Sequence, residues 1–128
     1  MRFLLHGAVT PEASAALIRH DHACHAASEL AADAAPDAAD GHLALFQQLA
    51  QKQWNLLTTD TALIRDLYER KLAFPGIIVM ILEDAGGTQD QGKAVDRLFD
   101  RYKRLTPGRL YTITPNRVKI RQLPGGHR

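Results

Sequence analysis

The chain has 128 residues, of which 45% are hydrophobic and 23% charged, a composition typical of one ordinary globular domain with a single core. Its one cysteine, Cys24, excludes an internal disulfide and fits a reducing compartment. The apolar run at the amino terminus is too short for a signal peptide or a membrane span. We therefore expect residues 1–128 to form one cytoplasmic domain that does not enter a membrane.

Charge divides the chain into an acidic body and a basic end. Residues 1–100 hold all 14 Asp and Glu but 8 of the 16 Lys and Arg, whereas residues 101–128 hold the other 8 and no acid. Such a basic segment suits either binding of a polyanion or self-association with the acidic body.

Hydrophobic patterns predict strands and helices in turn along residues 1–82. Continuous apolar runs indicate buried parallel strands, and apolar residues at three- and four-residue spacing indicate amphipathic helices. The expected elements are a strand at Arg2–Leu5, a helix at Pro11–His20 capped by Thr10, a weak strand at His22–Ala26, an alanine-rich loop at 26–41, a helix at His42–Lys52, a strand at Trp54–Thr58, a helix at Thr61–Lys71, a turn at Pro75-Gly76 and a strand at Ile77–Leu82.

The remaining residues predict a helix and a hairpin. We expect a turn and cap at Ala85–Thr88, a helix that ends near Arg104, and a β-hairpin formed by Arg109–Thr114 and Arg117–Leu123. The alternation of strands and helices implies an α/β fold. It would be a doubly wound parallel sheet with helices on both faces and a C-terminal β-hairpin.

Asp60 lies between the Trp54–Thr58 strand and the Thr61–Lys71 helix. In open α/β sheets ligands bind at this place, because strand ends open a crevice and the helix terminus supplies free N–H groups. The alternative is a helix N-cap, whose carboxylate accepts hydrogen bonds from the amides of the first turn. Both roles are open for Asp60.

Four segments resemble parts of a small bacterial PIN-like family of unknown function, which is related to toxin ribonucleases. MRFLLHGAVTPEASAAL resembles the opening strand and helix of the family, and LLTTDTAL resembles its central strand-acid motif. PGIIVMIL resembles its late buried strand, and GRLYTITPNRVKIRQLP resembles its final hairpin. The resemblance implies a PIN-like (Rossmann-like) domain whose strand ends gather carboxylates around Mg²⁺ or Mn²⁺ to hydrolyse RNA. It further implies a ribonuclease toxin with RNA as substrate, an antitoxin as protein partner and a homodimer as assembly.

The resemblance also assigns site residues. Asp60 matches the acid of the strand-end motif and Thr58 the hydroxyl before it, whereas His6 stands where the first acid of the family closes the opening strand. His42 is in register with the second acid, and Asp40 matches it if the loop slips by two residues. The catalytic candidates are therefore Asp60, Asp40, His6 and His42, with Asp60, Asp40 and His6 as metal ligands.

These departures from the family leave two interpretations open. Imidazoles with one or two carboxylates suit Mn²⁺, Fe²⁺ or Zn²⁺ better than Mg²⁺. Ala62 stands where the family has another acid, and Asp66 either replaces that acid or points to solvent. The alternative is a decayed site without a cofactor, in a catalytically degenerate PIN-like domain that acts as an RNA- or protein-binding module.

Arg117, Lys119 and Arg121 alternate with apolar residues, so the three cations should share one face of the second hairpin strand while Val118, Ile120 and Leu123 pack inward. One interpretation is a ribbon that binds the phosphates of nucleic acid. The other is a charged edge that discourages pairing between sheets.

Other motifs give weaker indications. His20, His22 and Cys24 alternate along an extended segment, but structural zinc sites use two separated ligand pairs, so a solvated edge strand is the alternative to zinc. Glu83-Asp84 ends the most buried strand and is either a site pair or an exposed turn. Gly86-Gly87 is not a phosphate loop, since no Gly-Lys-Ser/Thr follows, and neither a nucleophile elbow nor a paired CxxC is present.

Overall fold

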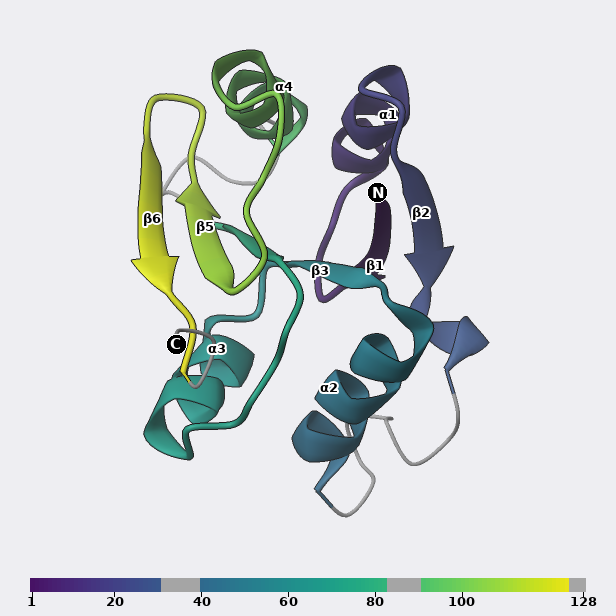
Figure 1. Cartoon of the computed structure of the whole chain (residues 1–128). Helices are drawn as coiled ribbons and strands as arrows, with labels where there is room; N and C mark the ends of the chain where they lie inside the picture. The colour runs from purple at the N-terminus through teal and green to yellow at the C-terminus, as the bar shows by residue number, and fades with distance from the viewer. Residues whose placement is uncertain (31–39, 83–90, 125–128) are drawn as a thin grey trace.

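Strands and helices alternate along the computed structural model, which describes residues 1–30, 40–82 and 91–124 (Figure 1). Most elements lie within two residues of their predicted bounds. They are β1 (Arg2–His6), α1 (Pro11–Arg19), β2 (Ala23–Ala26), the 3₁₀ helix η1 (Ala27–Glu29), α2 (Gly41–Lys52), β3 (Asn55–Thr58), α3 (Thr61–Glu69), β4 (Ile78–Ile81), α4 (Gln91–Arg101), β5 (Arg109–Ile113) and β6 (Val118–Gln122).

Several boundaries differ from the sequence prediction by one to three residues, and two of them have a visible hydrogen-bond partner. β2 begins at Ala23 because the N–H of His22 closes the end of α1, donating to the Leu17 carbonyl at 3.0 Å. α4 ends at Arg101, not near Arg104, and the Tyr102 N–H donates to the Leu98 carbonyl at 2.8 Å. The Ala85–Thr88 turn and Glu83-Asp84 lie outside the described residues, as does most of the expected loop at 26–41.

The strands form one six-stranded sheet in the order β2-β1-β3-β4-β5-β6. Neighbouring strands are parallel except for β5 and β6, which pair antiparallel with Tyr111 opposite Ile120. The predicted α/β fold with a C-terminal hairpin is thereby confirmed, and the sheet is Rossmann-like. β2 and β6 are the two edge strands.

Helices cover both faces of the sheet, as Figure 1 shows. α1 and α4 pack on one face through Ala13, Leu17, Val95 and Phe99, which belong to one buried cluster. α2 and α3 contribute to a second buried cluster on the other face. Adjacent residues of β3 divide between the clusters, because successive side chains of a strand point to opposite faces. This two-faced burial explains why β4 is a continuous apolar run that is buried throughout.

Candidate functional site

The candidate site lies at the carboxyl ends of β1 and β3, where the strand order changes direction. β2 pairs with one side of β1 and β3 with the other, and the last pair in the β1–β3 register is His6 beside Thr58. The chain leaves β1 for α1 on one face and leaves β3 for α3 on the opposite face. Connections that diverge in this way open a crevice, which is the usual ligand position in open α/β sheets.

The Thr58 hydroxyl joins two of the predicted site residues. Thr58 is fully buried, and its Oγ1 accepts the backbone N–H of Asp60 at 3.0 Å. The same oxygen lies 2.9 Å from Nδ1 of His6, where either group can be the donor depending on the imidazole tautomer. The hydroxyl therefore fixes the imidazole and the start of the Asp60 segment relative to each other.

The imidazole of His6 is held in its neutral form. Burial is the main cause that lowers its pKa from the ordinary 6.5, and the charge of His42 lowers it further, while the carboxylate of Asp60 acts in the opposite direction. A neutral imidazole can accept a proton or bind a metal ion.

Asp60 is the N-cap of α3. Its Oδ1 accepts the N–H groups of Ala62 at 3.0 Å and Leu63 at 3.2 Å, with extended backbone at the cap itself. This confirms the capping interpretation of the sequence. Both hydrogen bonds end on one oxygen, so capping leaves Oδ2 without a hydrogen bond from the described residues.

Asp40 and His42 belong to a neighbouring group that we call the Arg70 cluster, made of Asp40, His42, Asp66 and Arg70. The guanidinium of Arg70 donates to both carboxylate oxygens of Asp40, each at 2.9 Å, and its Nη1 also lies 3.1 Å from Oδ2 of Asp66. That same Asp66 oxygen lies 2.9 Å from Nδ1 of His42. Arg70 thus donates to two carboxylates. Its contact with Asp40 has the bidentate geometry that arginine favours.

The charges of the Arg70 cluster stabilise one another. The hydrogen bond from Arg70 is the main cause that lowers the pKa of Asp40, and the hydrogen bond with His42 is the main cause that lowers the pKa of Asp66. The two carboxylates in turn raise the pKa of Arg70. All these side chains are partly exposed, so solvent screens their interactions and they add little to stability.

The structure therefore brings His6, Thr58 and Asp60 together, and places Asp40 and His42 with Arg70. Among residues 1–30, 40–82 and 91–124, no group of three or more His, Cys, Asp or Glu is arranged to hold a metal ion. Sequence reasoning overlooked Arg70, although the Asp66–Arg70 spacing of four residues on a helix is a recognisable ion-pair signal. The interpretation that Asp66 simply points to solvent is wrong, since it accepts from Arg70 and contacts His42.

The turn after β1 places the strand ends in contact. Gly7 has a φ of +79°, and a Cβ added there would lie 2.7 Å from Oγ1 of Thr59. That oxygen accepts the N–H of Ala8 at 2.7 Å. The buried side chain of Gln91, at the start of α4, then secures the rest of the turn by accepting from Thr10 N–H at 2.8 Å and donating to the Ala8 carbonyl at 3.0 Å.

Replacing Gly7 by alanine should lower the free energy of unfolding by about 1–2 kcal/mol, because an L-residue is strained at positive φ and the new methyl group meets the Thr59 hydroxyl. Urea denaturation followed by circular dichroism measures this difference. An unfolding midpoint equal to that of the wild type would contradict this geometry of the turn.

The lowered pKa of His6 gives the stability a pH dependence. As pH falls through 6.5 the unfolded chain binds the proton before the folded chain does, so stability decreases until the lower folded pKa is reached. Within that window each pH unit removes at most about 1.4 kcal/mol. His6→Gln should therefore reduce the loss of stability between pH 7.5 and 5.5, measured by urea denaturation at both values. A loss as large as that of the wild type would contradict the lowered pKa.

His20, His22 and Cys24 have separate partners. Nε2 of His20 lies 3.1 Å from Asp96, Nδ1 of His22 lies 3.2 Å from the amino terminus, and Sγ of Cys24 lies 3.8 Å from the Ser14 carbonyl oxygen. β2 is an edge strand, as the alternative to zinc predicted. Burial raises the pKa of the Cys24 thiol and is the main cause that lowers the pKa of His22.

The hairpin cations lie on the β6 edge, and one of them has a structural contact. The guanidinium of Arg121 lies 4.0 Å from the ring centre of Tyr68, whose hydroxyl donates to the Gln122 carbonyl at 2.7 Å. These contacts attach the hairpin to α3. Arg117 and Lys119 are exposed. A nucleic-acid role for Arg117, Lys119 and Arg121 stays a prediction.

The apolar residues of β6 pack inward only in part. Leu123 is buried and Val118 packs against the cluster under α1 and α4. The expectation for Ile120 was wrong, because its side chain is 41% exposed.

None of the helices in the described ranges has the length and apolar character needed to cross a membrane. Comparisons with protein-family models, with curated proteins and with solved structures found no match to this chain.

Proposed function

We propose that this chain is a PIN-like domain that has lost metal-dependent hydrolysis and acts as an RNA-binding module. The observation that carries the proposal is the bidentate contact between Arg70 and Asp40, at 2.9 Å for each oxygen. Hard cations such as Mg²⁺ need carboxylate oxygens. In this arrangement a guanidinium already occupies both oxygens of Asp40, the carboxylate that the resemblance assigns to the site beside Asp60.

The remaining donors also fit Mg²⁺ poorly. His6 supplies a nitrogen where the resemblance expects an acid, and Asp60 uses one oxygen to cap α3. Imidazole nitrogen is a poor ligand for Mg²⁺. The carboxylates of the region serve a helix start and an internal ion pair, which is what a site that no longer binds a metal ion would be expected to show.

The basic carboxyl-terminal segment supports binding of RNA over binding of a neutral partner. Its described cations are all exposed: Arg101, Lys103, Arg104, Arg109, Arg117, Lys119 and Arg121. Exposed cations bind the phosphate backbone and release counterions from it, so affinity should depend strongly on salt.

Calorimetry and an RNA assay on the same samples test the proposal. Mg²⁺, Mn²⁺ and Zn²⁺ are titrated into the wild type and Asp60→Asn, and a fluorescent single-stranded RNA is tested for binding and for cleavage. Asparagine keeps the oxygen that caps α3, so the substitution removes charge without removing the cap. We expect salt-dependent RNA binding without cleavage, and no metal binding that depends on Asp60.

A second function, a metal-dependent ribonuclease of the toxin type, is favoured by the neutral imidazole of His6 beside Asp60. Such a pair suits Mn²⁺ or Zn²⁺ better than Mg²⁺. Metal binding that Asp60→Asn abolishes, together with RNA cleavage that needs the same ion, would establish this function and overturn the first proposal. An antitoxin partner and a homodimer would then follow from the resemblance.

A further inference from the structure

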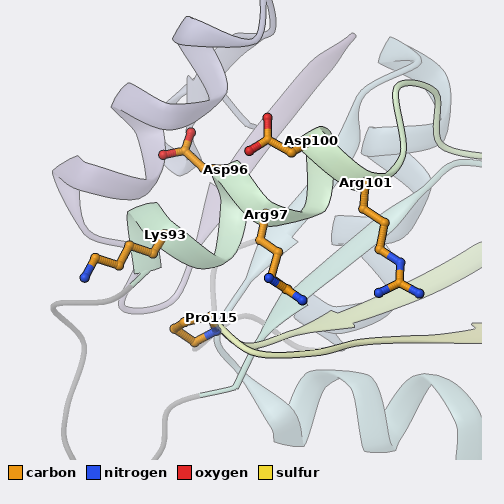
Figure 2. Close-up of a pocket in the computed structure, with 6 residues that line it drawn as sticks. All are labelled: Lys93, Asp96, Arg97, Asp100, Arg101 and Pro115. Atoms are coloured by element: carbon orange, nitrogen blue, oxygen red, sulfur yellow. The ribbon is translucent and has the colours of Figure 1, made fainter.

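A groove runs between α4 and the turn that joins β5 to β6 (Figure 2). Its volume is about 560 Å³, and its lining residues do not include His6, Thr58 or Asp60. The residues that line it come from α4 and from the hairpin turn: Lys93, Asp96, Arg97, Asp100, Arg101 and Pro115.

Three cations of α4 line this groove. Lys93, Arg97 and Arg101 recur at every fourth residue of α4, so they form a row with a step of about 6 Å. All three side chains are exposed, and Figure 2 shows them pointing toward the side of Pro115. Within the described parts of the chain, none of the three forms an ion pair.

The acids of α4 lie on the opposite side of the helix in Figure 2. Asp96 is already paired, since it accepts from Arg19 at 2.7 Å and lies 3.1 Å from Nε2 of His20. These two partners come from α1 and its end, which pack beside α4. The pairing draws the charge of Asp96 toward α1. Asp100 also lines the groove, so three cations stand against two carboxylates, one of which is paired.

We propose that this groove binds the phosphate backbone of single-stranded RNA. The inference rests on the proposed function and names the surface that performs it. A row of three cations matches a run of phosphates, and the described residues that line the groove include no aromatic side chain on which bases could stack. Backbone contacts carry no sequence information, so the binding should tolerate any sequence and weaken strongly as salt rises.

The hairpin cations are the competing surface, and one contact argues against them. The guanidinium of Arg121 lies over the ring of Tyr68, so this side chain helps to attach the hairpin to α3. Among the described residues, Lys93 and Arg97 make no comparable contact. The guanidinium of Arg101 lies 5.8 Å from the ring centre of its neighbour Tyr102.

Binding of a fluorescent, mixed-sequence RNA is measured by anisotropy over a series of salt concentrations for the wild type and three variants. The test variant carries Lys93→Gln, Arg97→Gln and Arg101→Gln. The charge-matched control replaces three exposed cations on other elements, with Arg2→Gln, Arg65→Gln and Lys71→Gln. The third variant removes hairpin charge with Arg117→Gln and Lys119→Gln.

The α4 variant should bind at least about tenfold more weakly, and the slope of log affinity against log salt should fall by about 2, since each lost phosphate contact on a single strand removes about 0.7. The control should keep the wild-type slope. A wild-type slope in the α4 variant, or a loss of the same size in all three variants, would overturn the groove but keep the proposed function. Absence of RNA binding by the folded wild type would overturn both.

Discussion

Replacing Thr58 by valine is expected to lower the free energy of unfolding by about 1–3 kcal/mol, even though valine has nearly the same shape. The Thr58 hydroxyl is fully buried and serves both the Asp60 N–H and Nδ1 of His6. Valine offers neither donor nor acceptor, so both polar groups lose their partner away from bulk water. Urea denaturation measures the loss, and the ¹⁵N shifts of the His6 ring report the tautomer.

Serine at position 58 is the control for this experiment. It keeps the hydroxyl and removes one buried methyl group, which should lower stability by about 1 kcal/mol. The decisive measurement is therefore the imidazole, because the ring shifts of His6 should change in Thr58→Val and stay as in the wild type in Thr58→Ser. Unchanged shifts in the valine variant would contradict the hydrogen bond as the link between the two strand ends.

The sequence was most informative where local patterns decide the structure. β4 is apolar throughout because both its faces are covered, and this alone predicts a central strand. Asp60 follows a strand and precedes a helical pattern, and the structure shows the cap that this position favours. The alternation of strands and helices then led to the α/β sheet without any long-range information.

The candidate site was harder to predict because its contacts join residues that are far apart in the chain. Arg70 reaches Asp40 across 30 positions, and Asp40 is placed for this contact by a left-handed backbone conformation with φ of 49°. Neither this contact nor this backbone conformation produces a periodic pattern in the sequence. Arg121 illustrates the same limit, since alternation put it with the other hairpin cations while its contact with Tyr68 depends on how β6 lies against α3.

These long-range contacts distinguish the acids near the strand ends from the cations of α4. The acids of the strand-end region are engaged internally, by Arg70 and by the first turn of α3. The cations of α4, by contrast, line a groove, and Asp96, one of the two acids that line it with them, is paired with α1. Exposed cations that form no ion pair among the described residues suit a polyanion as partner, which is what the proposed function requires.

If Arg70 occupies the position that a metal ion would otherwise take, then its removal should restore metal binding. Nη1 of Arg70 lies between carboxylate oxygens of Asp40 and Asp66, and His42 contacts the second of these. Asp40 is 44% exposed, so its side chain can turn toward an ion once the guanidinium is gone. Two carboxylates and an imidazole are ligands that suit Mn²⁺.

Calorimetry should show that Arg70→Gln binds Mn²⁺ at least about tenfold more tightly than the wild type, a difference of about 1.4 kcal/mol. Arg65→Gln is the matched control, since Arg65 is an exposed cation of the same helix that forms no ion pair with the described residues. Adding Asp66→Asn to Arg70→Gln should remove the gain, because it takes away one of the two carboxylates. Equal Mn²⁺ affinity in Arg70→Gln and Arg65→Gln would mean that Arg70 only balances charge, and the proposed loss of metal chemistry would lose its main support.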